Sequence, residues 1–170
     1  MIAVAMRHIL LASGFVAITC MAFGQEQGVA PPKDTIFARK ILMGSISTNM
    51  DELEAMTAEG AKLNLTEGQE HADIISVMLM SFPHMFPQST NQWTANADRD
   101  PAYDTYAAPE VWSNFADFYQ TAGAASKIAF EASRAKNATD FKALVVQLRE
   151  ACNSCHAAYM KVDEEKPAQK

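Results

Sequence analysis

The chain has 170 residues, of which 49% are hydrophobic and 20% are charged, and its formal net charge is −6 at pH 7. This length and composition fit one globular domain that is large enough to bury a cofactor. The acidic balance argues against a nucleic-acid partner, because binding to phosphates requires clustered lysines and arginines. It does allow electrostatic steering toward a basic redox partner.

The N-terminal segment has the pattern of a secretory signal peptide. Arg7 precedes an uncharged apolar run over residues 9–23, and small residues at its end suit a cleavage site. The run is too short to favour a membrane-spanning helix. We expect residues 1–24 to be removed on export to the periplasm, which leaves no stable membrane span. Residues 25–33 are expected to form a disordered lead.

A first helix is expected over residues 34–59. Asp34 is a good N-terminal cap, and Gly60 suits a helix stop. Arg39 lies in the middle of the expected inner face. The apolar residues that share this face at helical spacing are Ile36, Leu42, Met43, Ile46, Met50 and Leu53.

A second helix is expected to open at Thr66, where Gln69 completes a capping box, and to end at Pro83. The connection over residues 83–108 is rich in Pro, Asn, Asp and Thr. It is longer than a simple bundle requires, and we expect it to cover one end of the core.

A third helix is expected from Pro109, a favoured first-turn residue, with Glu110 beside it to complement the helix dipole. Its expected inner face carries Trp112, Phe115, Tyr119, Ala122, Ser126 and Phe130. A fourth helix begins after Asp140. One stripe of it holds Phe141, Leu144, Val145, Leu148, Cys152, Cys155, His156 and Tyr159. These patterns predict an all-α, antiparallel four-helix bundle over residues 34–161, followed by a polar tail over residues 162–170.

The stripe of the fourth helix contains a C-x-x-C-H motif, formed by Cys152, Cys155 and His156, which is the attachment signature of c-type haem. Two thiols at this spacing add across the two vinyl groups of a haem, and the adjacent histidine becomes the proximal ligand of the iron. Cys20 is the remaining cysteine and lies in the expected signal peptide. One covalent haem c per chain is therefore expected.

Two other uses of a C-x-x-C pair fit the pattern less well. A thioredoxin-like dithiol would follow a strand and start a helix, whereas this pair lies late in a helix. A zinc site needs about four ligands. Beyond the motif, His71 and His84 are the nitrogen donors left outside the expected signal peptide.

Three segments within residues 34–161 follow a known pattern. They are Arg39-Lys40-Ile41-Leu42-Met43, Pro109-Glu110-Val111-Trp112 followed by Phe115 and Phe118, and the C-terminal C-x-x-C-H-x-x-Tyr that ends at Tyr159. On these segments the chain resembles the cytochrome c′ family. The resemblance implies a left-handed four-helix bundle with the haem between the helices, often as a homodimer. Phe37 and Ile41 lie outside the main stripe and would meet a partner subunit or the second helix.

The resemblance makes the sixth position of the iron decisive for function. Gas-binding members have an apolar residue four positions after the first-helix arginine, whereas low-spin members have a methionine that ligates. Met43 occupies that position here. A thioether opposite His156 keeps the coordination alike in both oxidation states, as electron carriers need. Methionine also fills cores well, and Met50 and His71 are the alternative ligands.

Family members use the first-helix arginine near the haem edge, which implies that Arg39 pairs with the haem propionates. An arginine on an apolar face otherwise reaches out to solvent or pairs with a carboxylate. Trp112 is expected in the core with the haem as a neighbour. Gas-binding members commonly carry a basic residue directly after the tyrosine. Met160 takes that place here and Lys161 follows, which mildly favours electron transfer.

The sequence thus predicts an exported monohaem electron carrier that is not an enzyme and exchanges electrons with redox partner proteins. Cys152 and Cys155 would anchor the haem, and His156 and Met43 would ligate the iron. The alternative is a five-coordinate haem protein that binds nitric oxide or other diatomic gases, in which Met43 only crowds the distal side. A thiol-disulfide enzyme is a third hypothesis.

Overall fold

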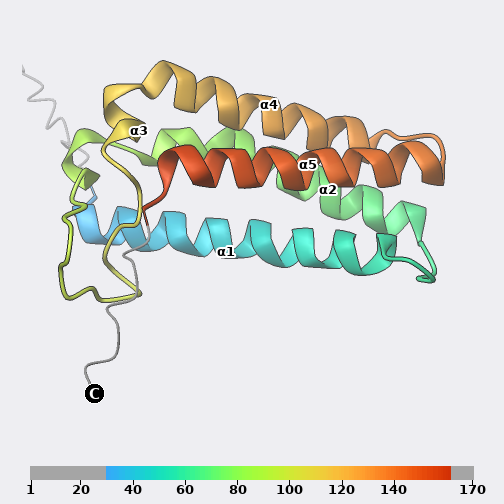
Figure 1. Ribbon diagram of the computed structural model, residues 1–170, viewed down its shortest axis with the longest axis horizontal. Coiled ribbons are helices and arrows are strands. Elements are labelled where there is room, and N and C mark those ends of the chain that lie inside the picture. Colours follow the sequence, from blue (N-terminus) through green and yellow to red (C-terminus); the bar gives the residue numbers. More distant parts are fainter. Residues whose placement is uncertain (1–29, 162–170) are drawn as a thin grey trace, which may run out of the picture.

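Four long helices form an antiparallel bundle in the computed structural model, which describes residues 30–161 (Figure 1). The long helices are α1 (Pro32–Thr57), α2 (Leu65–Ser81), α4 (Phe115–Ser133) and α5 (Ala138–Tyr159). The short ones are η1 (Phe82–Met85), η2 (Gln88–Thr90) and α3 (Glu110–Ser113). The predicted all-α, four-helix fold is confirmed. None of the described helices is long and apolar enough to cross a membrane. The predicted signal peptide and polar tail lie outside the described residues.

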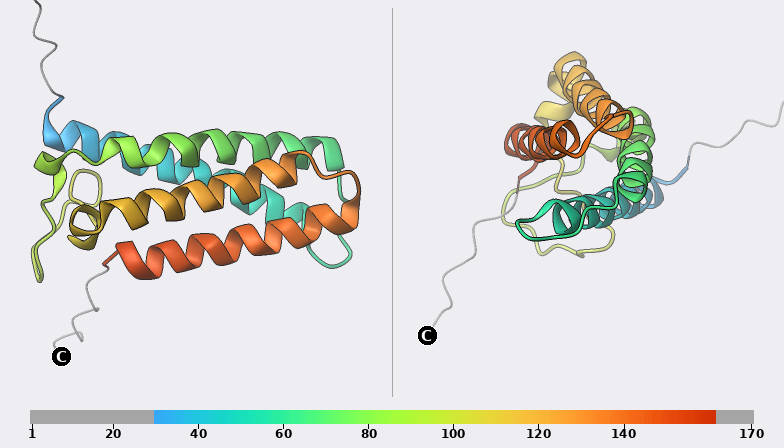
Figure 2. Two further views of the ribbon diagram at one scale, coloured as in Figure 1. Left: turned by 90° about the horizontal axis from the view of Figure 1, so that it is seen from above. Right: turned by 90° about the vertical axis from the view of Figure 1, so that its right-hand side faces the viewer.

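Neighbouring helices around the bundle pack to different extents. The end-on view in Figure 2 shows α2 beside both α1 and α4, with α5 against α4. The α1–α5 pair is the least closely packed of the four neighbouring pairs. This side of the bundle is therefore the more open one.

The first helix begins earlier than its sequence pattern predicts. Pro31 precedes the helix and Pro32 is its first residue, where the missing N–H of proline costs nothing. Asp34 lies in the first turn and does not cap the helix, so the predicted disordered lead over residues 25–33 is wrong for its last residues. The helix ends at Thr57, because Ala58 is extended with ψ 159°, so the predicted end at Glu59 is two residues too late. Gly60, with φ +77°, lies in the turn that follows.

The predicted capping box of α2 is wrong, because an asparagine upstream takes that role. Asn64 Oδ1 accepts a hydrogen bond from the Glu67 N–H at 3.4 Å and starts the helix before Thr66. Gln69 instead donates to the carbonyl oxygen of Ala135 at 2.9 Å. Both Asn and Thr cap helices well, so sequence alone does not choose between them.

The third predicted helix is interrupted at Asn114, whose φ of −127° and ψ of 44° separate α3 from α4. The predicted inner face is wrong in part, since Phe115, Tyr119 and Phe130 are 40%, 42% and 48% exposed. The residues that α4 does bury are Phe118, Ala122, Ala125, Ser126, Ala129, Ala132 and Ser133. Small side chains on this face let α2 approach closely, so the large aromatic residues are displaced to its edge.

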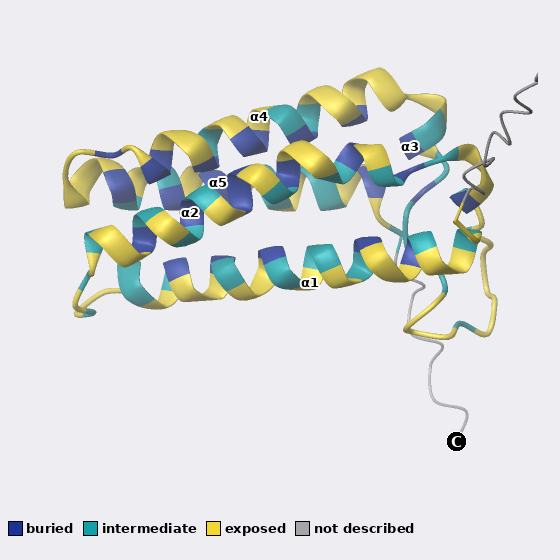
Figure 3. Ribbon diagram, turned by 180° about the vertical axis from the view of Figure 1, so that it is seen from behind, coloured by how far each residue is buried: buried dark blue, intermediate teal, exposed yellow. Residues whose placement is uncertain are grey.

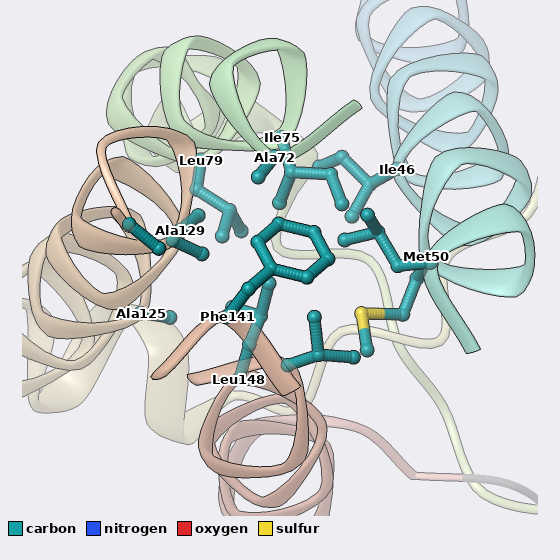
Figure 4. Close-up of a cluster of buried hydrophobic side chains, with 13 residues drawn as sticks. Ile46, Met50, Ala72, Ile75, Leu79, Ala125, Ala129, Phe141 and Leu148 are labelled. Atoms are coloured by element: carbon teal, nitrogen blue, oxygen red, sulfur yellow. The ribbon is translucent and has the colours of Figure 1, made fainter. Parts of the chain in front are cut away.

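The core at the end of the bundle where α5 begins is densely packed around Phe141. Figure 4 shows its ring among side chains from α1, α2, α4 and α5. A β-carbon built at Gly68 of α2 would lie 2.6 Å from this ring, so the close approach requires glycine. Each long helix shows buried and exposed sides in alternation, as Figure 3 illustrates.

The long connection over residues 83–108 covers the opposite end of the bundle, as its sequence predicts. Thr90, Thr105 and Ala108 of this connection are buried. An isolated antiparallel bridge pairs Ala107 with Met160, just beyond the end of α5. The connection is thus attached to the helix that carries the C-x-x-C-H motif.

Candidate functional site

A cavity of about 370 Å³ lies at the covered end of the bundle. Cys152, Cys155 and His156 all line it, so the complete motif faces one space. The other walls are mainly apolar and include Met43, Ile46, Met50, Leu79, Phe82 and Phe118. This arrangement suits a large, flat and mostly apolar group.

The N-terminal cap and the apolar stripe of α5 position the motif at the cavity. The helix begins at Ala138, where the Asn137 side chain accepts a hydrogen bond from the Asp140 N–H at 2.9 Å. Phe141 and Leu148 then anchor the helix in the core, each with no exposed surface. Further along the same stripe the side chains reach the cavity instead of the core.

Burial sets the protonation of the motif. It raises the pKa of the Cys155 thiol to about 11 and also raises the pKa of Cys152. Burial, with the nearby charge of Arg149, lowers the pKa of His156. The imidazole is therefore neutral at pH 7, which is the form that ligates iron. A dithiol oxidoreductase needs a lowered thiol pKa, so these thiols disfavour that alternative.

Two methionines of α1 reach the cavity that His156 lines. Met43 is half-buried, whereas Met50 is 1% exposed and belongs to the core cluster. The structure therefore brings Met43 and His156 to one space from two different helices. Both thioethers lie on the α1 side of the cavity, and Met50 is the more tightly packed of the two.

Arg39 is a buried cation beside the same cavity, with 4% of its surface exposed. It donates hydrogen bonds to the hydroxyls of Thr90, at 3.1 Å, and Thr105. Its guanidinium carbon lies 4.3 Å from the centre of the Phe86 ring. Burial lowers the pKa of Arg39 to about 10, so the group stays charged at pH 7. Within residues 30–161 it has no carboxylate partner, so a bound carboxylate would complete its environment.

Trp112 supports this corner without lining the cavity. Its indole Nε1 donates to the carbonyl oxygens of Phe86 at 3.0 Å and Pro87 at 3.3 Å. Its ring also lies 5.8 Å from the guanidinium carbon of Arg39. The structure thus places Trp112 against Phe86 and Arg39, and its direct contact with haem stays a prediction.

Two of the described residues, His71 and His84, are histidines outside the motif, and both lie away from the cavity. His71 Nδ1 is 2.8 Å from Asn49 Oδ1, in a contact that joins α2 to α1. The His84 ring packs edge-on against Tyr119 at 5.9 Å. Neither residue is in position to ligate iron in the cavity. The described residues also contain no cluster of three His, Cys, Asp or Glu side chains suited to a metal ion.

Several cavity residues come from the long connection and were missed by the sequence analysis. Thr105, Tyr106 and Ala107 line the cavity. They are held there by backbone hydrogen bonds, such as the one from Lys161 N to Tyr106 O at 2.8 Å. Lys161 itself pairs with Glu110 at 3.0 Å. No periodic pattern or motif marks these loop residues, so only the folded chain reveals them.

Tyr159 closes the α5 side of the cavity. Its hydroxyl donates a hydrogen bond to the carboxylate of Asp117 on α4, which raises the pKa of Tyr159 to about 12. Met160 follows it and also lines the cavity, so no basic side chain occupies this position. The tyrosine therefore ties α4 to the helix that carries His156.

The donor set fits a covalently attached haem. Two thiols and a neutral imidazole share one wall, apolar side chains form the others, and a buried guanidinium stands beside the space. A family model described as cytochrome C′ matches residues 34–160. The chain belongs to the cytochrome c′ family. Cytochromes c′ carry covalently bound haem c, so the predicted cofactor is confirmed.

Solved structures of cytochromes c′ share the fold at low sequence identity. Cytochrome c′ from Rubrivivax gelatinosus aligns with a TM-score of 0.65 and 23% identity, over 78% of this chain and 98% of that one. Cytochrome c′ from Thermochromatium tepidum aligns with a TM-score of 0.65 and 20% identity over the same shares, 78% and 98%. A nitric oxide complex of a mutant cytochrome c′ from Alcaligenes xylosoxidans has a TM-score of 0.65 and 18% identity, again over 78% and 98%. No curated protein sequence matches the chain.

Proposed function

We propose that Cys152 and Cys155 form the thioether bonds to haem c and that His156 is the proximal ligand of its iron. The support is geometric, since the three side chains share one face of α5 and line one cavity. Arg39 would pair with a haem propionate, because its guanidinium is buried beside the cavity. Trp112 would hold Arg39 in place.

We propose that this cytochrome c′ binds nitric oxide or another diatomic gas. The lining of the cavity carries the proposal: apart from His156, its described side chains include neither an imidazole nor a carboxylate that could ligate iron. Haem c supplies an iron that binds small diatomic molecules when its sixth position is open. The nitric oxide complex of the Alcaligenes xylosoxidans protein, which has the same fold, supports the proposal. Met43 would then shape the distal space without ligating.

A one-electron carrier is the second candidate, and the place of Met43 favours it. Met43 lines the same cavity as His156 from another helix. An iron held by histidine and methionine changes its coordination little between oxidation states, which suits electron transfer. The protein would then exchange electrons with redox partner proteins. Neither candidate function makes it an enzyme.

Titration of the ferrous protein with carbon monoxide, followed by absorption, tests the gas-binding proposal. We expect one carbon monoxide bound per haem in the wild type. Met43→Leu keeps the bulk of the side chain and removes its sulfur, so the affinity should change by less than about tenfold. Met50→Leu is the matched control. A wild type that binds no carbon monoxide, beside a Met43→Leu variant that does, would instead support the electron carrier.

We also propose that the protein acts in the periplasm as a homodimer. The export signal expected over residues 1–24 supports the location. Apolar side chains on the outer sides of α1 and α2 support the dimer, since Ile41 and Val77 are 56% and 63% exposed. Phe37, which is 39% exposed, stacks on Tyr103 with ring centres 5.2 Å apart. A cytochrome c′ of the same fold shows ligand-controlled dimer dissociation.

A further inference from the structure

Arg149 and Glu54 form an ion pair that joins α5 to α1. Arg149 Nε donates to Glu54 Oε1 at 2.5 Å, and Nη2 donates to Glu54 Oε2 at 2.7 Å. This bidentate geometry fixes the plane of the guanidinium. Asp51 lies 3.8 Å from the same group. In the described part of the chain, all side-chain hydrogen bonds and ion pairs between α1 and α5 involve Arg149.

Arg149 also separates the haem cavity from a hollow on the surface. It lines the cavity together with Cys152 and Met50. It lines a second hollow of about 210 Å³ together with Glu54 and Val146. Of the residues between 30 and 161, Arg149 alone lines both spaces. A path from solvent through this second hollow to the cavity therefore passes this side chain.

The ion pair gives Arg149 a closed position that opens readily. Two charge-assisted hydrogen bonds hold the guanidinium between the two spaces. The side chains of Arg149 and Glu54 are 34% and 42% exposed, so water screens their attraction. A screened pair adds little to stability, so little free energy is needed to separate it. These properties suit a side chain that lets small molecules pass intermittently.

We propose that Arg149, held by Glu54, controls the passage of diatomic gases between solvent and the haem cavity. The inference rests on the proposed gas-binding function and adds the route and the residue that sets its rate. A barrier along the route slows arrival and departure alike. Arg149 therefore changes the association and dissociation rate constants by one factor and leaves the equilibrium affinity unaltered.

Rebinding of carbon monoxide to the ferrous holoprotein after flash photolysis tests this role. Arg149→Gln removes the positive charge and one of the two hydrogen bonds to Glu54, so the association and dissociation rate constants should both rise about fivefold. Glu54→Gln should act in the same way, and the swapped pair Glu54→Arg with Arg149→Glu should restore slow rates. Arg134→Gln is the matched control, because it removes an ion pair to Asp73, at 3.4 Å, that joins other helices.

Unchanged rate constants in Arg149→Gln, with wild-type haem content and circular dichroism, would overturn the proposal. A changed affinity without parallel changes in the two rate constants would also overturn it, because it would place the effect at the iron. The series is repeated in a Met43→Ala background. If the wild type binds no carbon monoxide but Met43→Ala binds it and shows the Arg149 effect, gas binding fails as the function while control of access by Arg149 stands.

Discussion

The two ends of the bundle differ in how their interior is filled. At one end the ring of Phe141 fills the space among four helices, and Gly68 lets α2 approach it. At the other end the helices leave a cavity of about 370 Å³, which residues of the long connection help to line. Side chains alone complete the dense end. At the cavity end the space is left for the cofactor, and Cys152, Cys155 and His156 line it.

The largest expected effect concerns the cavity end. Changing Cys152 and Cys155 together to Ala should abolish covalent haem, because no other thiol of the described residues lines the cavity. Mass spectrometry of the denatured chain measures the attachment. Ser154→Ala, between the two cysteines, is the control and should keep the haem. Covalent haem in the double variant would contradict the assignment of the anchors.

Phe141→Ala should destabilise the densely packed end of the bundle. The variant loses a fully buried ring at the centre of four helices, so we expect the free energy of unfolding to fall by about 3–5 kcal/mol. Denaturant titration of the holoprotein by circular dichroism measures it. The haem spectrum should stay as in the wild type, since the cavity lies at the other end. Phe130→Ala, at a site that is 48% exposed, should cost less than about 1 kcal/mol.

A partner subunit would cover the outer sides of α1 and α2. Ile41→Glu and Val77→Glu each place a charge among exposed apolar side chains, so we expect about tenfold weaker dimerisation. Sedimentation at several protein concentrations measures the change. Val146→Glu, on α5 at 59% exposure, is the control. A dimer that survives both changes and dissociates with Val146→Glu would place the interface elsewhere.

The smallest effect is a pH dependence at the edge of the cavity. The hydrogen bond from Arg149 holds the pKa of Glu54 below its ordinary value of 4.5. A carboxyl group whose pKa is lowered by folding stabilises the folded state above its unfolded pKa and loses that contribution as the pH falls through the folded pKa. Glu54→Gln should therefore be less stable than the wild type at neutral pH. The difference should shrink below about pH 4 in denaturant titrations. A difference that persists in acid would contradict the ion pair.

The long helices could be predicted because their apolar spacing reflects burial directly. The α1 face with Ile36, Ile46 and Leu53 is buried as the sequence indicates. The α4 face could not be predicted in full, because which residues are buried depends on how closely α2 approaches. Ala129 is completely buried, whereas Tyr119 is 42% exposed. Side-chain size misleads where two helices pack through small residues.

The residues of the site could likewise be predicted from the sequence only in part. The motif at Cys152, Cys155 and His156 could be predicted because its spacing itself encodes the chemistry. Arg149 and Tyr106 could not, because their places depend on how a loop and two helices meet far apart in the sequence. The sequence also left the role of Met43 open, since methionine serves both as a ligand and as a core residue.

The absorption spectrum of the purified ferrous protein tests the central claim most directly. We predict the broad bands of a five-coordinate, high-spin haem c, which change on addition of carbon monoxide or nitric oxide. A sharp low-spin α band that neither gas alters, and that is lost in Met43→Ala, would contradict the gas-binding account.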